Sequence, residues 1–195
     1  MIKIHNFEQK SQEWFDVRKL KLTASNAQAI GANGKGLETY VTEIMAEYYS
    51  KAPKESYTNE DMVRGNELEG LARECYEIEN SVKVEQVGFI EMNDFVGCSP
   101  DGLIGEDGLL EVKCPNDVKH YRMIRDGEKE MDSKYMWQCQ MQLLVTERKW
   151  IDLVFFNPNF DKKLITFKME KEEKYQEALK LGIEQGILKI KEQLI

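Results

Sequence analysis

Residues 97–115, GCSPDGLIGEDGLLEVKCP, carry the strongest structural signal in the chain. Two turns, Pro-Asp-Gly and Gly-Glu-Asp-Gly, precede a segment, residues 109–114, whose side chains alternate as they do in a strand. Alternate side chains of a strand share a face, so Glu111 and Lys113 lie on one face and the leucine and valine before them on the other. The stretch therefore predicts a hairpin that ends with a carboxylate beside an ammonium group.

An acid in the first turn adds chemistry to this hairpin. Glu111 and Lys113 alone could form an ordinary ion pair. Asp101, however, stands ten positions before Glu111, where a folded hairpin could bring the two carboxylates close together. Two carboxylates at one point repel each other unless a cation lies between them. The three residues together therefore predict a site for a divalent metal ion.

Two carboxylates and a lysine around one point are what metal-dependent phosphodiester hydrolysis requires. The acids would hold one or two Mg²⁺ ions, and Lys113 would orient the attacking water or stabilise the developing charge. The pattern Pro-Asp, spacer, Glu-x-Lys resembles the PD-(D/E)xK nuclease superfamily. Because Glu-x-Lys alone is frequent in charged chains, the resemblance depends on the Pro-Asp, the turns and the strand.

The composition is that of a globular protein. The chain has 195 residues, 42% of them hydrophobic and 32% charged, which fits one domain, residues 1–195, with a sizeable core. No apolar run is long enough to span a bilayer, and residues 1–6 lack the apolar core of a signal peptide. We therefore expect a protein of the cytoplasm with no role at a membrane.

Charge and cysteine usage narrow the expected function. The formal net charge of −8 argues against a surface that binds DNA everywhere, because such binding depends on cations that neutralise phosphates. No Cys-x-x-Cys pair occurs, so we expect buried free thiols rather than disulfides, a zinc site or an iron–sulfur centre. A nuclease would confine its basic residues to one groove, for which the candidates are Arg18, Lys19, Lys21, Lys113, Lys119, His120, Arg122 and Arg125.

Three further motifs narrow the resemblance. The first is Trp14-x-x-x-Arg18 followed by LTAS at residues 22–25, where a helix from Ser11 to about residue 21 is expected to end and the next to be capped. The others are CSPDG with LEVKCP inside the hairpin and YMWQCQ at residues 135–140. In this order they resemble the phage recombination exonucleases of the lambda exonuclease or YqaJ-like group.

The resemblance implies a phosphate site. In that family the arginine after the first tryptophan and the serine of the Thr-Ala-Ser segment bind the 5′-phosphate of a DNA end, which transfers to Arg18 and Ser25. A guanidinium and a hydroxyl at a helix start are good phosphate donors. Ser25 could also be a plain N-cap, and Arg18 a surface residue. The resemblance also places Ser99 and Lys119 beside the DNA.

Two more residues complete the implied catalytic site. Glu69 lies next to the apolar stripe of a helix expected at residues 59–80, where an acid needs a partner. The resemblance assigns Glu69, in preference to Glu67, to the metal site, and it assigns Gln138 to the catalytic centre. The implied metal ligands are the carboxylates of Asp101, Glu111 and Glu69 and the backbone carbonyl of Val112. Two Mg²⁺ ions are expected, with Mn²⁺ as a substitute.

The strands and helices expected along the rest of the chain indicate the α/β (α+β) fold class. The resemblance implies the restriction-endonuclease-like fold, a central mixed β-sheet flanked by helices. It also implies a homotrimeric ring around double-stranded DNA ends and a single-strand annealing protein as partner. A ring would explain processivity without a basic surface. Strands are expected at residues 84–91, 95–98, 150–156 and 164–168, and helices at 37–49, 117–125, 133–146 and 170–195.

The sequence thus predicts a Mg²⁺-dependent 5′→3′ exonuclease of phage or prophage origin, acting in a bacterial host. It would release mononucleotides from linear duplex DNA and leave a 3′ single strand for recombination by annealing. Two other functions stay open: a structure-specific DNA endonuclease with the same metal site, and a DNA-end-binding module without catalysis. The complete set of Asp101, Glu111 and Lys113 counts against the binding module.

Overall fold

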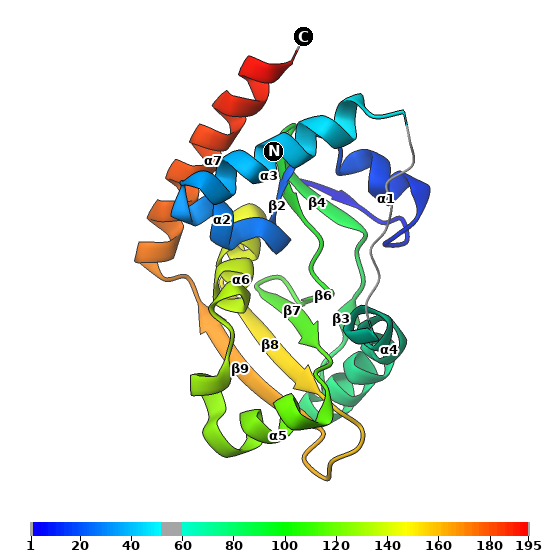
Figure 1. The fold of residues 1–195 in the computed structure, drawn as a ribbon. Helices are drawn as coiled ribbons and strands as arrows, with labels where there is room; N and C mark the ends of the chain where they lie inside the picture. The colour runs from blue at the N-terminus through cyan, green and yellow to red at the C-terminus, as the bar shows by residue number, and fades with distance from the viewer. Residues whose placement is uncertain (1, 52–59, 195) are drawn as a thin grey trace.

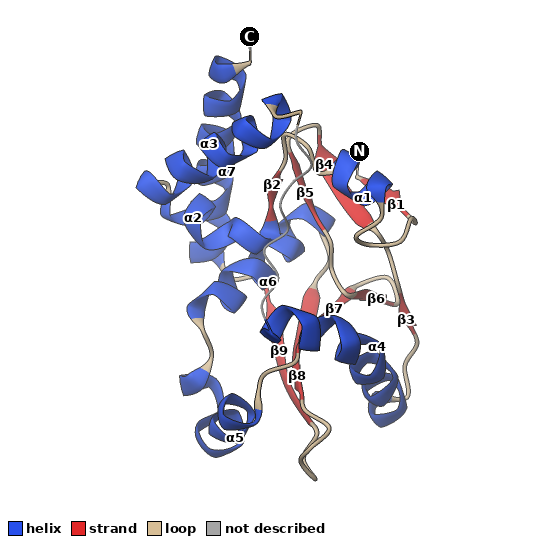
Figure 2. Ribbon diagram, turned by 45° about the vertical axis from the view of Figure 1, so that its right-hand side comes forward, coloured by secondary structure: helices blue, strands red, loops and turns tan. Residues whose placement is uncertain are grey.

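Two mixed β-sheets form the centre of the computed structural model, which describes residues 2–51 and 60–194 (Figures 1 and 2). The first sheet has the order β1-β4-β5-β2 and the second the order β3-β6-β7-β8-β9. Strand β2 runs parallel to β5, and β7 parallel to β8, while the other neighbours are antiparallel. The strands are β1 Lys3–His5, β2 Leu22–Thr23, β3 Val84–Glu85, β4 Phe89–Asn93, β5 Val96–Cys98, β6 Gly102–Ile104, β7 Gly108–Lys113, β8 Trp150–Phe156 and β9 Leu164–Glu170.

Helices cover these sheets from both sides. Helix α6 contacts strands of both sheets, α7 packs on α2, α3 and α6, and α4 lies against β7 and β9 (Figure 2). The mixed α/β class expected from the sequence is confirmed, although two sheets replace the single central one. The helices are α1 Gln12–Val17, η1 Ala24–Asn26, α2 Ala27–Ala32, α3 Lys35–Tyr49, α4 Glu60–Asn80, α5 Asp117–Asp126, η2 Gly127–Glu130, α6 Ser133–Thr146 and α7 Glu173–Gln193.

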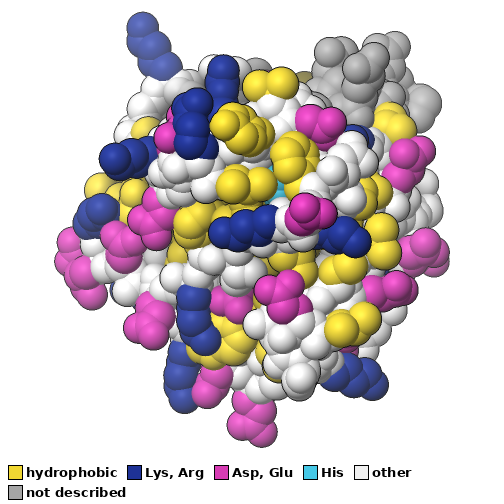
Figure 3. Space-filling model, turned by 90° about the horizontal axis from the view of Figure 1, so that it is seen from below, with side chains coloured by type: hydrophobic (Ala, Val, Ile, Leu, Met, Phe, Trp, Pro, Cys, Tyr) yellow, Lys and Arg dark blue, Asp and Glu magenta, His cyan; other side chains and the backbone are white. Residues whose placement is uncertain are grey.

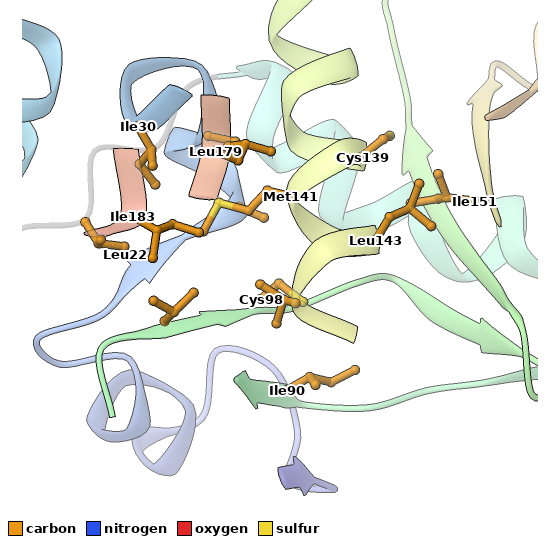
Figure 4. Close-up of a cluster of buried hydrophobic side chains, with 14 of the residues drawn as sticks. Leu22, Ile30, Ile90, Cys98, Cys139, Met141, Leu143, Ile151, Leu179 and Ile183 are labelled. Carbon is orange, nitrogen blue, oxygen red and sulfur yellow. The ribbon is translucent and has the colours of Figure 1, made fainter. Parts of the chain in front are cut away.

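The main hydrophobic core lies where α6 packs between the strands and α7 (Figure 4). A smaller apolar cluster on the other side of the second sheet joins α4 to β7 and β8. The core therefore fixes α6 and α4 on opposite faces of β7. The side chains labelled in the main core are Leu22, Ile30, Ile90, Cys98, Cys139, Met141, Leu143, Ile151, Leu179 and Ile183.

The alternation expected for residues 109–114 is confirmed. Leu110 and Val112 belong to the smaller cluster beneath α4. Glu111 and Lys113 point to the other face, where both hydrogen-bond to Gln138 of α6. Strand β7 therefore presents a polar pair to α6 and an apolar pair to α4.

The strand expected at residues 84–91 is wrong as one element. It breaks after β3, and β4 begins in the other sheet. Gly88 lies at this break, and a Cβ there would come within 2.2 Å of the carbonyl oxygen of Phe7. The N-terminal segment passes close to Gly88, at the point where the chain leaves the second sheet for the first.

The helix boundaries differ at several ends. Ser11 caps α1 as expected, since its hydroxyl accepts from the amide of Trp14 at 3.3 Å, but α1 ends at Val17. Ser25 lies inside the 3₁₀ helix η1, so its alternative role as an N-cap is wrong. Helix α7 begins three residues later than expected; residues 59 and 195 lie outside the described residues.

All four cysteines are free, as expected, but only Cys98 and Cys139 are buried, while Cys75 and Cys114 are partly exposed.

Among the described residues, no helix is long and apolar enough to cross a bilayer.

Candidate active site

The β6–β7 hairpin fixes Asp101 through two hydrogen bonds. The amide of Asp101 donates to the carbonyl of Leu110 at 3.1 Å, and its Oδ2 accepts from the amide of Val112 at 2.7 Å. The carboxylate thus takes the place of a backbone group in pairing with β7. This arrangement brings Asp101 into the same hollow as Glu111, in a cavity of about 470 Å³.

Glu111 is buried and held by donors on both oxygens. Its Oε1 accepts from Lys113 Nζ and Gln138 Nε2, each at 2.6 Å, and its Oε2 accepts from Gln142 Nε2 at 2.7 Å. An ammonium and two amides therefore hold the carboxylate in one orientation. Gln138 was predicted from the sequence and Gln142 was not, although its position one helical turn later on the same face was the available signal.

Lys113 lies between the acids as a permanent cation. Partial burial opposes its charge, but Glu111 and Asp101 overcome that effect and raise the pKa of the ammonium above its usual value. Lys113 also donates to Gln138 Oε1 at 3.2 Å. A lysine ammonium at this place can orient a ligand or stabilise negative charge.

Negative charge exceeds what Lys113 balances. Burial and the carboxylates of Glu111 and Glu69 raise the pKa of Asp101 well above its ordinary value, although Lys113 and the Val112 amide oppose the shift. A cation among the three acids would relieve this repulsion.

The donor set fits a hard divalent cation in kind. Carboxylates of Glu69, Asp101 and Glu111 and the backbone of Val112 line the hollow, and oxygen ligands of this type suit Mg²⁺. Within residues 2–51 and 60–194, however, no three His, Cys, Asp or Glu side chains already stand in an arrangement that could hold a metal ion. The residues fit the ion chemically without forming a finished cage.

Helix α4 supplies the third acid. Glu69 lines the hollow and lies 3.6 Å from the guanidinium of Arg73, whereas Glu67 is exposed. The helix is anchored one turn further on, where the Tyr76 hydroxyl donates to Asp152 Oδ2 of β8 at 2.5 Å. This anchor holds α4 at the depth from which Glu69 reaches the hollow.

The predicted phosphate residues gather at the end of β5. Ser99 Oγ accepts from Trp14 Nε1 at 2.9 Å and from Arg18 Nη1 at 3.5 Å, and the guanidinium stacks 4.0 Å from the Trp14 ring centroid. Burial lowers the pKa of Arg18 from its usual high value, which still leaves the guanidinium charged. Ser99 stands two residues before Asp101, so this group adjoins the acids along the chain.

Ser25 reaches the same end of the first sheet. Strand β2 pairs in parallel with β5, with Thr23 opposite Gly97, so Ser25 and Ser99 follow at the same end. Ser25 is exposed, and its hydroxyl lies 3.2 Å from that of Thr23. An exposed hydroxyl at this end of the sheet is available to a ligand.

Lys119 lines the hollow from α5. Its Nζ donates to the Tyr135 hydroxyl at 3.4 Å, and the Tyr135 ring has Lys113, Lys119 and Lys134 within 5.1 to 5.2 Å of its centroid. Tyr135 and Lys134 were not assigned from the sequence. Three ammonium groups around one ring give this wall of the hollow its positive charge.

The other basic candidates do not join this wall. Lys19 pairs with Asp16, Lys21 is buried and donates to the Asp94 carbonyl, and His120 is buried against the Lys162 carbonyl. On the face seen in Figure 3, acidic and basic side chains alternate with apolar ones and form no continuous basic surface. Of the eight candidates for a basic groove, Lys113 and Lys119 line this hollow.

The chain is similar to known proteins in sequence and in fold. Residues 13–149 match the family described as YqaJ-like viral recombinase domain. The crystal structure of LHK-Exo, an alkaline exonuclease from Laribacter hongkongensis, is similar with a TM-score of 0.84 at 29% sequence identity, over 94% of each chain. A structure of LHK-Exo in complex with dAMP matches equally well.

Two further proteins are less similar to this chain. A phage-related exonuclease from Haemophilus somnus 129PT has a TM-score of 0.70 at 16% identity, over 91% of this chain and 96% of that one, which shows a common fold. An uncharacterized protein of Acanthamoeba polyphaga mimivirus is 27% identical over 168 residues, covering 78% of this chain. The chain spans 30% of the length of that viral protein.

Proposed function

The chain belongs to the family of YqaJ-like viral recombinase domains, and from this membership we propose that it is a 5′→3′ exonuclease acting on linear duplex DNA. It would release mononucleotides and leave a 3′ single strand for recombination by annealing. The observation that carries the proposal is the hollow in which Glu69, Asp101 and Glu111 meet Lys113. The likeness to LHK-Exo, an alkaline exonuclease crystallised with dAMP, supports the same reaction class.

The cofactor would be Mg²⁺, two ions, replaceable by Mn²⁺. The carboxylates of Asp101, Glu111 and Glu69 and the carbonyl of Val112 would hold it. When bound, such ions lower the pKa of a coordinated water and neutralise charge on the phosphate oxygens.

The chain's own residues would orient the reactants. Glu111 is fixed by Lys113, Gln138 and Gln142, which leaves one lone pair, on Oε2, free in a fixed direction. The Lys113 ammonium, held charged by two acids, would donate to the scissile phosphate or the attacking water. Preorganised donors of this kind do not have to reorient during the reaction.

The 5′-phosphate would be bound beside this centre. Arg18 and Ser99 already contact each other, and Ser25 is exposed at the same sheet end. A guanidinium and two hydroxyls would hold the terminal phosphate while Lys119 contacts the backbone. Such a grip explains why an enzyme of this kind needs a free end.

A time course on DNA tests the proposal. The substrate is linear blunt duplex with a 5′-phosphate, labelled at either end, incubated with Mg²⁺ or chelator beside closed circular DNA. We expect early release of mononucleotide from the 5′ label, only on linear DNA and only without chelator. Cutting of the circle would favour a structure-specific endonuclease, and binding without cutting a DNA-end-binding module.

Assembly and partners are part of the same proposal. From the resemblance to the family we expect a homotrimer that encloses DNA. Such a ring would explain processivity although the net charge of −8 provides no general DNA affinity. Light scattering coupled to gel filtration measures the mass directly. The expected partner is a single-strand annealing protein encoded beside this chain, and co-purification of the two would test that.

A further inference from the structure

A second hollow opens beside the candidate active site. It has a volume of about 580 Å³ and shares Asn66, Glu69 and Asp101 with the first hollow. Beyond these residues it is lined by residues 6–10 of the N-terminal segment and by Arg73. Glu69 and Asp101 therefore lie where the two hollows adjoin, and we call the two hollows together the groove.

One face of α4 forms a wall of both hollows. Gly65 lines the first hollow, Gly70 and Arg73 line the second, and Asn66 and Glu69 line both. A Cβ added at Gly65 or Gly70 would meet nothing within 4 Å. Glycine weakens a helix interior, so two glycines on this face reduce helix stability while they keep the groove open.

Two cations face the second hollow. Arg73 is 15% exposed, and with the Gln86 amide oxygen turned toward it, that oxygen accepts from Nη1 and Nη2 at 2.9 Å. Lys10 is exposed and its Nζ donates to Asn66 Oδ1 at 2.6 Å. Among the described residues, the lining contains one acid, Glu8, apart from the acids shared with the first hollow.

The wall opposite α4 is fixed to the active site. Gln9 Nε2 donates to the carbonyl of Val87 at 3.0 Å and to that of Pro100 at 3.1 Å. Pro100 directly precedes Asp101, so these hydrogen bonds hold residues 6–10 in a fixed position relative to Asp101. Lys10 of this wall and Arg73 of α4 place one cation on each side of the hollow beside the acids, which suits a second phosphate of the same strand.

We propose that the second hollow binds the sugar–phosphate backbone of the strand being degraded, with Arg73 and Lys10 on a phosphodiester next to the scissile one. This inference rests on the proposed exonuclease function and adds a subsite to it. A released mononucleotide needs only one hollow. A strand that continues beyond the scissile bond needs the groove on both sides of the acids.

The test is binding of a 5′-phosphorylated duplex, with dAMP as a mononucleotide competitor, at several salt concentrations in chelator. Gly70→Leu fills the second hollow, Lys10→Ala removes a cation, and Lys180→Ala, an exposed lysine of α7, is the matched control. We expect Gly70→Leu to weaken duplex binding about tenfold and more than it weakens dAMP binding. Lys10→Ala should reduce the salt slope by about 1, and Lys180→Ala should not.

The outcomes separate binding from folding and from catalysis. Replacing a helical glycine should raise the melting temperature, so weaker binding by Gly70→Leu would not come from unfolding. Wild-type affinity and slope in both variants would overturn the subsite, and so would equal weakening of duplex and dAMP, which would assign the hollow to the released nucleotide. A wild-type chain that binds duplex through this hollow but hydrolyses none would overturn the nuclease proposal alone.

Discussion

Two buried carboxylates on neighbouring strands are held in opposite ways. Glu111 of β7 is 3% exposed and accepts hydrogen bonds from Lys113 and two glutamines of α6. Asp152 of β8 is 7% exposed and accepts one from Tyr76, and its Oδ1 has no hydrogen-bond partner among residues 2–51 and 60–194. One carboxylate opens into a hollow; the other is enclosed in a hydrophobic cluster.

Strand register explains the difference. Asp152 lies opposite Leu110, and Glu111 opposite Leu153, so the two acids point to opposite faces of the sheet. Asp152 meets the apolar side of α4, whereas Glu111 meets the polar side of α6. The same functional group therefore ties a helix to the sheet in one place and prepares a reaction in the other.

The largest effect should come from removing the ammonium group of Lys113, which is paired with Glu111. Lys113→Met takes away the ammonium that balances Glu111 and Asp101, so we expect the single-turnover rate on 5′-phosphorylated duplex to fall about 10³-fold. Lys168→Met, on β9 with its ammonium 3.7 Å from the Trp150 ring centroid, is the matched control. A loss below about tenfold for Lys113→Met would remove Lys113 from the chemistry.

The glutamines of α6 provide a second contrast. Gln142→Leu removes the donor to Glu111 Oε2, and a partner of this kind contributes about 10- to 100-fold to activity. Gln140→Leu is the control, because Gln140 is buried on the same helix but bonds to Glu170 and Glu172. We expect Gln140→Leu to lower the melting temperature and Gln142→Leu to lower kcat. The reverse assignment would contradict the role given to Gln142.

The anchor of α4 should affect stability first. Tyr76→Phe leaves Asp152 buried without its donor, so the free energy of unfolding should fall by about 2 kcal/mol. Urea denaturation measures this value, with the exposed Tyr48→Phe as control. An unchanged midpoint would mean that the Tyr76–Asp152 contact contributes nothing to stability.

The smallest effect is stabilisation by the cation itself. At ten times its dissociation constant, a Mg²⁺ ion that binds only the folded chain adds about 1.4 kcal/mol. Because the pKa of Asp101 is raised on folding, the chain without metal should lose stability as pH rises from the ordinary value of 3.8 through the raised one. Mg²⁺ should therefore raise the melting temperature most at pH values above the raised pKa of Asp101. Asp101→Asn should abolish both the stabilisation by Mg²⁺ and the loss of stability with rising pH. Equal shifts in wild type and Asp101→Asn would mean that the ion binds elsewhere.

Much of the hairpin could be predicted because its signals are local. Turn residues, alternation and the Pro-Asp spacing all act within residues 97–115, and the structure places Asp101, Glu111 and Lys113 around one hollow. Gln138 was found through the family resemblance. Gln142 was not assigned, although its place one helical turn after Gln138 on the same face was the available signal.

Long-range contacts account for the other differences. The break between β3 and β4 depends on Phe7 crossing at Gly88, a contact between distant residues. Lys21 and His120 appeared basic and available, yet tertiary packing buries both. The Tyr76–Asp152 tie joins residues 76 positions apart and has no local sequence signature.

The two carboxylates themselves give the most direct test. Single-turnover hydrolysis of 5′-phosphorylated linear duplex with Mg²⁺ would be measured for Glu111→Gln and Asp152→Asn, at a temperature where circular dichroism shows both folded. We expect Glu111→Gln to lose at least about 10³-fold in rate while keeping its melting temperature, and Asp152→Asn to stay within about tenfold of wild type while melting earlier. A Glu111→Gln chain that hydrolyses DNA within about tenfold of wild type would contradict the assignment of this site.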